Sequence, residues 1–266
     1  MEVFQAVILG IIQGIAEFLP ISSSGHLILV PKFTGWQDQG IGFDLSVHIG
    51  TLFAILIYFR KDVSTLAVDG LKSIHQRKTV GQSQLFWAVL LGTIPACIVG
   101  ALILDLIEQS LRSEKVIFFT TIIFGILLGL ADRKGNTGRD LETVTWKEGI
   151  LIGCAQAVAL IPGTSRSGIT MTTGLFLGLN RKAASRFSFF LAIPITGLAA
   201  TAKLIEIATS NESVEWGIFL LGAIVSFVVG LATIHYFLKW LNAFGMLPYV
   251  IYRLLLGLVI YVVFLS

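Results

Sequence analysis

The chain has 266 residues, of which 55% are hydrophobic and only 13% are charged, and its mean hydropathy is +0.85. Ordinary soluble domains carry about 25% charged residues, so this composition excludes a soluble globular protein and indicates an integral membrane protein. The net charge of +3 is too small to argue for a nucleic-acid partner. Long segments rich in Leu, Ile, Val and Phe favour membrane helices over the short strands of a membrane barrel.

The first apolar stretch, residues 2–19, is expected to be a helix that Pro20 ends, because proline lacks an N–H donor. Its start is acidic at Glu2 and does not resemble a cleavable signal peptide, so we expect none. The spacing predicts one polar stripe along this helix, made of Glu2, Gln5, Gln13 and Glu17. Gly10 and Gly14 form a small-xxx-small pair that would let another helix approach closely.

Three consecutive serines follow Pro20 and offer N-cap hydroxyls to a second short helix over about 25–33. Each of these two helices is shorter than the ~20 residues that a membrane span needs. We therefore interpret them as the arms of a re-entrant hairpin with a polar tip near mid-membrane. Such a tip requires protein or a water-filled cavity around it.

Six longer apolar segments and a second broken pair complete the chain. The first three spans are expected at about 41–60, 84–105 and 115–131. The second broken pair is expected at about 148–161 and 166–179, with Pro162-Gly163 at the break. The last three spans are expected at about 183–205, 215–238 and 248–265.

The two broken pairs match at a constant offset. The matched positions are Gly10 with Gly153, Gln13 with Gln156, Ser22 with Ser165, Ser24 with Ser167 and Gly25 with Gly168. The reactive positions differ, since the offset places Glu17 on Leu160, Ser23 on Arg166 and His26 on Ile169. We interpret residues 1–266 as one membrane domain made of two repeats, about 1–131 and about 146–266. Each repeat has three full spans, an odd number, so the second is expected to be inverted, as in many transporters.

The distribution of basic residues predicts the orientation. Three segments on one expected face hold most of them: Arg60, Lys61, Lys72, Arg77 and Lys78; Arg133, Lys134, Arg139 and Lys147; Arg181 and Lys182. An excess of Lys and Arg marks a cytoplasmic face. The first hairpin would then open to the outer side and the second to the cytoplasm, with their tips meeting inside the membrane.

Each tip places hydroxyl groups at the start of a helix, where free N–H groups attract anions. Arg166 adds a permanently charged fork that matches phosphate oxygens, which favours a phosphate site. Glu17 and His26 are candidate acid/base groups, Ser23 is a candidate nucleophile, and an activated water is the alternative nucleophile. Glu17 is also a candidate ligand for a divalent metal. The further candidate phosphate-binding residues are Gln13, Ser22, Ser24, Gly25, Thr164, Ser165, Ser167 and Gly168.

Structural roles compete with these interpretations. The serines of the first tip could simply cap a half-helix, and Arg166 could form a purely structural ion pair with Glu17. Asp44 and His48, spaced i, i+4, are more readily explained as interfacial than as part of the site. Arg253 lies near a span end, and we expect it to snorkel towards the membrane surface.

Two motifs in order carry a family resemblance: Gln13-x-x-x-Glu17-Phe-Leu-Pro-x-Ser-Ser-Ser-Gly-His26 and Pro162-Gly-Thr-Ser-Arg-Ser-Gly168. The chain resembles the undecaprenyl-diphosphate phosphatases of the bacitracin-resistance type over essentially its whole length. In that family the first motif begins with Glu or Gln. This chain has the Gln form, which implies that Glu17 carries any catalytic carboxylate role.

The resemblance implies that a C55 prenyl diphosphate loses its terminal phosphate at the outer side of the bacterial cytoplasmic membrane. This reaction would recycle the lipid carrier of peptidoglycan synthesis and confer bacitracin resistance. The resemblance also implies help from a divalent cation, for which Mg²⁺ and Ca²⁺ are the candidates. A lipid-phosphate flippase on the same scaffold is the alternative, because broken helices at mid-membrane are typical of transporters. The sequence leaves open whether the chain forms a homodimer.

Overall fold

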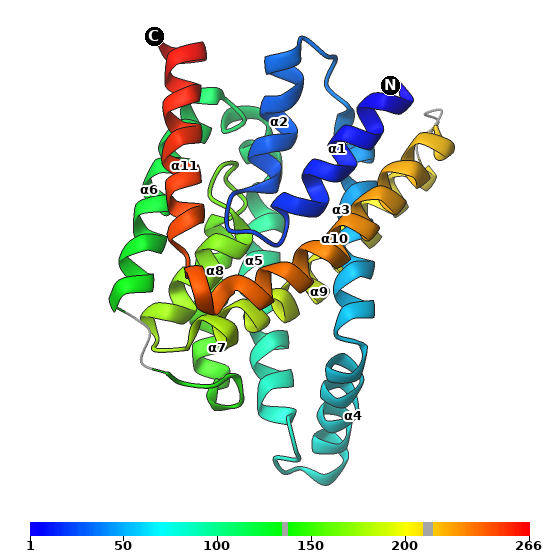
Figure 1. The fold of residues 1–266 in the computed structure, drawn as a ribbon. Helices are drawn as coiled ribbons and strands as arrows, with labels where there is room; N and C mark the ends of the chain where they lie inside the picture. The colour runs from blue at the N-terminus through cyan, green and yellow to red at the C-terminus, as the bar shows by residue number, and fades with distance from the viewer. Residues whose placement is uncertain (135–137, 210–214) are drawn as a thin grey trace.

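The computed structural model describes residues 1–134, 138–209 and 215–266, and it is built of helices (Figure 1). The helices of the first half are α1 (Val3–Ala16), α2 (Ser23–Thr34), α3 (Gly40–Tyr58), α4 (Arg60–Gln76), α5 (Ser83–Ser110) and α6 (Glu114–Lys134). Those of the second half are η1 (Leu141–Thr143), α7 (Trp146–Val158), α8 (Arg166–Phe176), α9 (Arg181–Thr209), α10 (Trp216–Phe244), α11 (Leu247–Ile260) and η2 (Tyr261–Leu265). Within the described ranges there is no β-strand, only an isolated bridge between Arg139 and Leu179.

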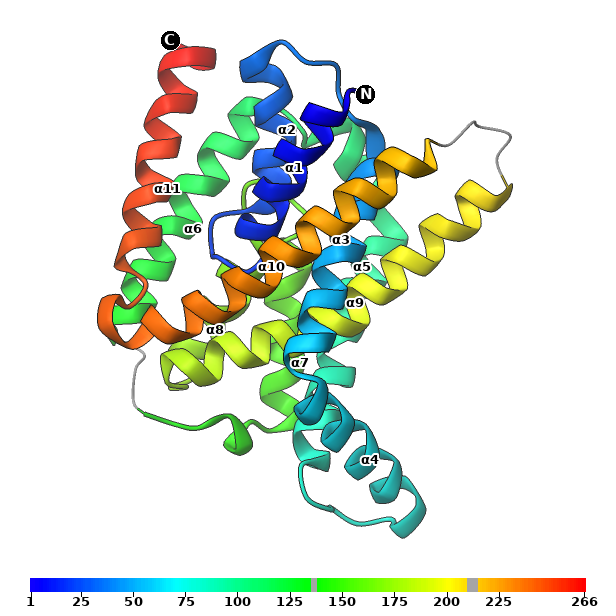
Figure 2. The same cartoon turned by 45° about the vertical axis from the view of Figure 1, so that its right-hand side comes forward.

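Five helices are long and apolar enough to cross a membrane, namely α5, α6, α9, α10 and α11 with its extension η2. The prediction of an all-helical, multi-pass membrane protein is therefore confirmed. Figure 2 shows α9 and α10 running obliquely beside each other across the bundle. Their outward side chains include Leu198, Leu220 and Val228, each more than half exposed, as lipid-facing positions would be.

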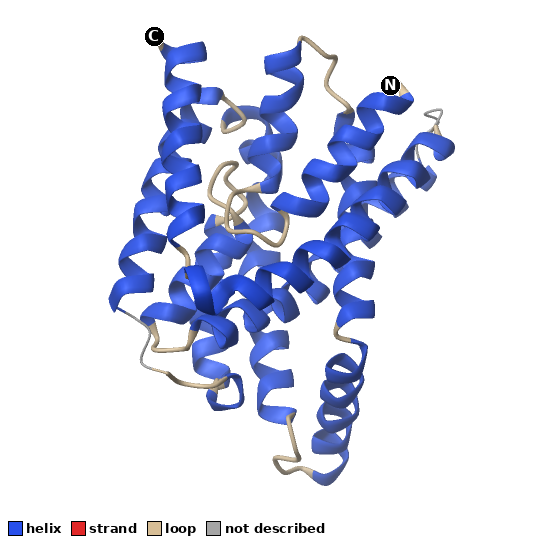
Figure 3. Cartoon of the chain, in the orientation of Figure 1, coloured by secondary structure: helices blue, strands red, loops and turns tan. Residues whose placement is uncertain are grey.

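The first predicted hairpin is present with shifted boundaries. Helix α1 ends at Ala16, three residues before the predicted end, because residue 19 precedes Pro20 and is driven away from helical geometry. Helix α2 begins at Ser23 and ends at Thr34, and its C-cap is Gly35, whose φ of 70° is the left-handed conformation that favours glycine. The second hairpin, α7 and α8, has the same design of two short helices joined by an irregular loop (Figure 3).

Helix α4 was not predicted, since the basic residues after the first span were expected to lie in a loop. It meets α3 at an angle of 81°. Leu66, Gly70 and Ser73 are its buried positions and repeat every three to four residues, as on one face of a helix. A Cβ atom at Gly70 would lie 2.4 Å from the Phe86 ring, so this face packs tightly on α5. The basic residues of the segment drew attention away from this helical period.

Glycines bring helices into contact on both sides of the site. A Cβ atom at Gly14 would lie 2.7 Å from Cβ of Val229, so the predicted close approach occurs between α1 and α10. A Cβ atom at Gly153 would lie 2.0 Å from the carbonyl oxygen of Gly92, so α7 lies directly against α5. These contacts fix the arms of both hairpins and hold their loops in the middle of the bundle (Figure 3).

Candidate active site

Glu17 is the centre of a hydrogen-bonded cluster at the first tip. Its side chain is 8% exposed. Its Oε2 accepts a 2.6 Å bond from the Ser23 hydroxyl and a 2.9 Å bond from Nε2 of Gln13. Gln13 is one helical turn before Glu17, so these two residues of the predicted polar stripe lie on the same side of the chain. Four of the sequence candidates therefore meet here, because the fourth, Arg166, contacts the other carboxylate oxygen.

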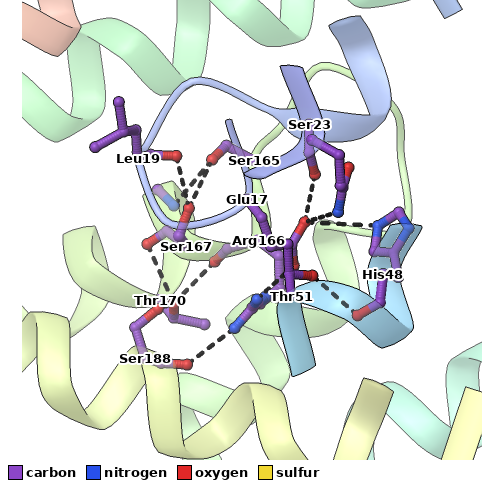
Figure 4. Close-up of polar contacts among 12 residues, drawn as sticks. Glu17, Leu19, Ser23, His48, Thr51, Ser165, Arg166, Ser167, Thr170 and Ser188 are labelled. Atoms are coloured by element: carbon purple, nitrogen blue, oxygen red, sulfur yellow. Dashed lines mark hydrogen bonds and ion pairs between the residues drawn. The ribbon is translucent and has the colours of Figure 1, made fainter. Parts of the chain in front are cut away.

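Arg166 is the first residue of α8 and reaches Glu17 from the second tip. Its Nη2 lies 2.7 Å from Oε1 of Glu17, and its Nη1 donates to the carbonyl oxygen of Ser188 at 3.0 Å (Figure 4). Thr170 Oγ1 donates to Oγ of Ser188, so α8 and α9 together orient the guanidinium. This partly buried pair adds little net stability, since the loss of hydration opposes the attraction. Arg166 places a permanent positive charge beside the carboxylate to which Ser23 donates.

The two tips have the same local conformation. Ser22 and Ser165 are the N-caps of α2 and α8, both with φ of 73°, a region that side-chain-bearing residues rarely adopt. The Ser22 hydroxyl accepts from the N–H of Gly25, and the Ser165 hydroxyl accepts from that of Gly168. The backbone N–H groups of Gly25 and Gly168, both predicted to bind phosphate, are thus already used in capping bonds. The repeat seen in the sequence is a repeat of backbone geometry.

The tips touch each other directly. Ser167 Oγ donates to the carbonyl oxygen of Leu19 at 2.9 Å (Figure 4). A Cβ atom at Gly25 would lie 3.5 Å from Cα of Gly163. Thr164 is fully buried between them. The predicted meeting of the two tips is confirmed by these contacts.

Arg253 corrects a prediction, because its side chain is fully buried instead of snorkelling to the surface. Its guanidinium donates to the carbonyl oxygens of Pro20 and Thr164, one from each tip, at 3.3 and 3.0 Å. It also donates to the carbonyl oxygens of Gly163, Thr120 and Thr121. Irregular backbone at this depth leaves carbonyl groups without helix partners, and one planar cation satisfies several of them.

The structure places His48, and not His26, next to Glu17. Nδ1 of His26 donates to the carbonyl oxygen of Ser22, and its Nε2 is 2.6 Å from the Tyr252 hydroxyl. His26 is therefore turned away from Glu17. His48, which was expected to be interfacial, has its Nε2 3.5 Å from Oε2 of Glu17 and its Nδ1 on the carbonyl oxygen of Asp44. The i, i+4 spacing with Asp44 was the available signal in the sequence.

A cavity of about 600 Å³ opens beside this cluster. Its polar wall includes Glu17, the three tip serines Ser22, Ser23 and Ser24, and Ser165, Arg166, His48 and Asp44. Its apolar wall comes from α5, α9 and the loop that follows α7, with Ala96, Leu160, Ile195 and Ala199. A polar end next to an apolar wall suits an amphipathic ligand with a charged head and a hydrocarbon chain.

The cluster does not by itself form a cage for a metal ion. In the described part of the chain, no three His, Cys, Asp or Glu side chains are grouped so as to hold one. Both oxygens of Glu17 already accept hydrogen bonds. Mg²⁺ is commonly bound by one or two carboxylates together with substrate phosphates, and the polar wall has carboxylates at Glu17 and Asp44. Glu17 and Asp44 would therefore suit a cation that is bound partly by the protein and partly by the oxygens of a phosphate group.

Comparison with known proteins agrees with this geometry. Residues 6–259 match the family described as bacitracin resistance protein BacA. A protein of Idiomarina loihiensis named undecaprenyl-diphosphatase is 61% identical and aligns with 99% of this chain and 100% of its own length. A protein of the same name from Marinobacter nauticus is 58% identical, with 99% of each chain covered. This chain belongs to the bacitracin resistance protein BacA family.

Proposed function

We propose that the protein hydrolyses undecaprenyl diphosphate to undecaprenyl phosphate and inorganic phosphate. The single observation that carries the proposal is the junction of Ser23, Glu17 and Arg166 at the polar end of a cavity with an apolar wall. A hydroxyl, a carboxylate that accepts its proton and a fixed cation are the groups that phosphoryl transfer requires. The names of the full-length relatives support the same reaction.

In the proposed mechanism the diphosphate lies at the polar end and the prenyl chain extends along the apolar wall. Glu17 takes the proton of Ser23, whose Oγ forms a bond to the terminal phosphorus while the bridging P–O bond breaks. Undecaprenyl phosphate leaves, and water then cleaves the phosphoserine to release inorganic phosphate. Arg166 stabilises the charge on the terminal phosphoryl oxygens. Direct attack by a water that Glu17 activates is the alternative.

Ser23 is a better candidate than Ser22 for the attacking group. The Ser23 hydroxyl points to Glu17 at 2.6 Å, whereas the Ser22 hydroxyl accepts the capping bond from Gly25. The remaining tip groups, Ser24, Thr164, Ser165, Ser167 and Gly168, shape the polar wall or the contact between the tips. The proposed acid/base role of His26 requires that Tyr252 first release its Nε2.

We propose that a divalent cation, Mg²⁺ or Ca²⁺, accompanies the substrate, with Glu17 as its candidate protein ligand. Such a cation would neutralise charge on the phosphate oxygens. We further propose that the protein lies in the bacterial cytoplasmic membrane, with its halves inverted and its site open to the outer side. The product would return to peptidoglycan synthesis, and loss of the diphosphate would confer bacitracin resistance.

A lipid-phosphate flippase is the alternative on the same scaffold. A flippase requires no nucleophile, whereas the Ser23 hydroxyl is paired with a proton acceptor. The names of the relatives describe hydrolysis and do not favour transport. In detergent micelles a phosphatase still releases phosphate, while a flippase has no second compartment to supply. Phosphate release in micelles therefore separates the two functions.

The test is phosphate release from undecaprenyl diphosphate by the purified protein and by Ser23→Ala, Glu17→Gln and Arg166→Ala. We expect each variant to lose about a hundredfold or more in kcat/KM. Ser46→Ala is the control, since its hydroxyl bonds only to the carbonyl oxygen of Phe43 on α3. Wild-type turnover in all three variants would refute the assignment. Activity retained by Ser23→Ala alone would select the water mechanism.

A further inference from the structure

Gln156 on α7 has a buried side-chain amide without a partner. The residue is 2% exposed, and neither Nε2 nor Oε1 has a hydrogen-bond partner among the residues that the structure describes. Gln156 also lines the cavity that holds Glu17 and Arg166. A buried amide without a hydrogen bond is unfavourable, so such a group in a cavity wall points to a partner that a ligand brings.

The matching position of the first hairpin shows what Gln156 lacks. Gln13 occupies that position, and its Nε2 donates to Glu17 four residues later at 2.9 Å. Four residues after Gln156 the chain has Leu160, which cannot accept a hydrogen bond. The second hairpin thus keeps the amide and has no carboxylate for it. Gln13 orients a group of the protein, whereas the amide of Gln156 is buried in the cavity wall without a partner.

The position of Gln156 is fixed by the contact between α7 and α5. Gly153, three residues earlier, lies so close to Gly92 that no side chain fits between the two helices. Ala96 follows Gly92 by one turn of α5, is buried and lines the same cavity. This backbone contact therefore holds the position of Gln156 at the cavity wall.

We propose that Gln156 binds the substrate, with Nε2 donating a hydrogen bond to a non-bridging oxygen of the diphosphate. This inference rests on the proposed function and adds a neutral donor to the charged one that Arg166 supplies. A hydrogen bond to a charged oxygen inside a low-dielectric cavity is stronger than one to a neutral acceptor. A neutral donor also adds no charge that a buried ion pair would have to balance.

The test replaces Gln156 with Met, which keeps the length of the side chain and removes both polar atoms. We expect kcat/KM for undecaprenyl diphosphate to fall about ten- to a hundredfold. We expect the melting temperature in detergent to stay the same or to rise, because the variant loses no internal hydrogen bond. Gln156→Glu, which places a carboxylate against the phosphate, should lose more activity than Gln156→Met.

Gln84→Met is the matched control, since the amide of Gln84 donates to the carbonyl oxygen of Val144 away from this cavity. It should keep its kcat/KM. A Gln156→Met protein with unchanged kcat/KM would overturn the inference. So would a parallel fall in melting temperature and activity, which is the result of a purely structural role.

A second measurement separates this inference from the proposed function. A prenyl diphosphonate, in which CH₂ replaces the bridging oxygen, binds without being hydrolysed and should raise the melting temperature of the wild-type protein. The rise should be clearly smaller in Gln156→Met, and an equal rise would refute the role of Gln156. A wild-type protein that binds the analogue but releases no phosphate would refute the hydrolase and leave the binding role of Gln156 supported.

Discussion

Nη2 of Arg166 lies 2.7 Å from Oε1 of Glu17, although 149 positions separate the two residues in the chain. Each residue stands at the tip of its own hairpin, so the ion pair forms only when both hairpins are in place. The polar end of the cavity is therefore shared by the two halves. Substitutions that loosen either tip should therefore act on the same site.

Arg166→Lys should lower kcat/KM by about a hundredfold, because one ammonium group cannot reproduce the planar fork between Glu17 and Ser188. The measurement is phosphate release in detergent. Arg186→Lys is the control, since Arg186 pairs with Asp62 and does not line the cavity. A turnover of Arg166→Lys within threefold of the wild type would show that geometry at this position is unimportant.

His48→Gln should stay within about threefold of wild-type activity, whereas His48→Leu should lose about tenfold. The reason is that Nε2 of His48 faces Glu17 at 3.5 Å, and a glutamine amide can supply a donor at the same place. Activity against pH for the two variants checks this. Equal loss in both variants would instead indicate that His48 transfers a proton.

Arg253→Met should destabilise the protein by about 3–5 kcal/mol, because it leaves buried carbonyl groups of both tips without their donor. Arg253→Lys should be intermediate, since an ammonium group reaches fewer of these oxygens. Thermal unfolding in detergent is the measurement, with Arg112→Met as the more exposed control. A melting temperature equal to that of the wild type would contradict the cross-link between the tips.

Gly153→Ala should destabilise the protein by about 1–3 kcal/mol, because the added carbon meets the backbone of Gly92 at 2.0 Å. Gly197→Ala provides the contrast: no atom lies within 4 Å of the added carbon, and alanine is the better helix former. Thermal unfolding should therefore rank Gly197→Ala at or above the wild type. The reverse order would show that α7 is not held by this contact.

Removal of divalent cations with a chelator should lower phosphate release, and Mg²⁺ or Ca²⁺ should restore it. The physical reason is that the cavity has basic side chains at Arg166 and Lys203 but also carboxylates at Glu17 and Asp44, so the protein by itself does not offset a multiply charged diphosphate. The melting temperature should not change on chelation, because the described residues hold no cage for a resident ion. Full activity in the chelator would remove the cation from the proposal.

Local patterns in the chain were enough to predict the helical membrane fold, both broken hairpins and the residues of the two tips. Span length, Pro20, the serine caps and the glycine pairs act over a few residues, so their effects can be read without a structure. Helix α4 was not predicted because the basic residues of the segment indicated a loop, and because only one of its three buried positions, Leu66, has a large apolar side chain. The burial of Arg253 was not predicted, because its position near the end of a span does not reveal which backbone carbonyl groups lie beside it in the folded protein.

The sequence by itself determined which chemical groups this protein places in the membrane: a carboxylate, hydroxyls, imidazoles and arginines in an apolar chain. Only the tertiary structure decided which of them face one another. It put His48 rather than His26 beside Glu17, paired Ser23 rather than Ser22 with the carboxylate, and left the amide of Gln156 without a partner in the cavity wall. The reason is that these contacts join helices far apart in the chain, where packing and the pairing of buried polar groups set the geometry.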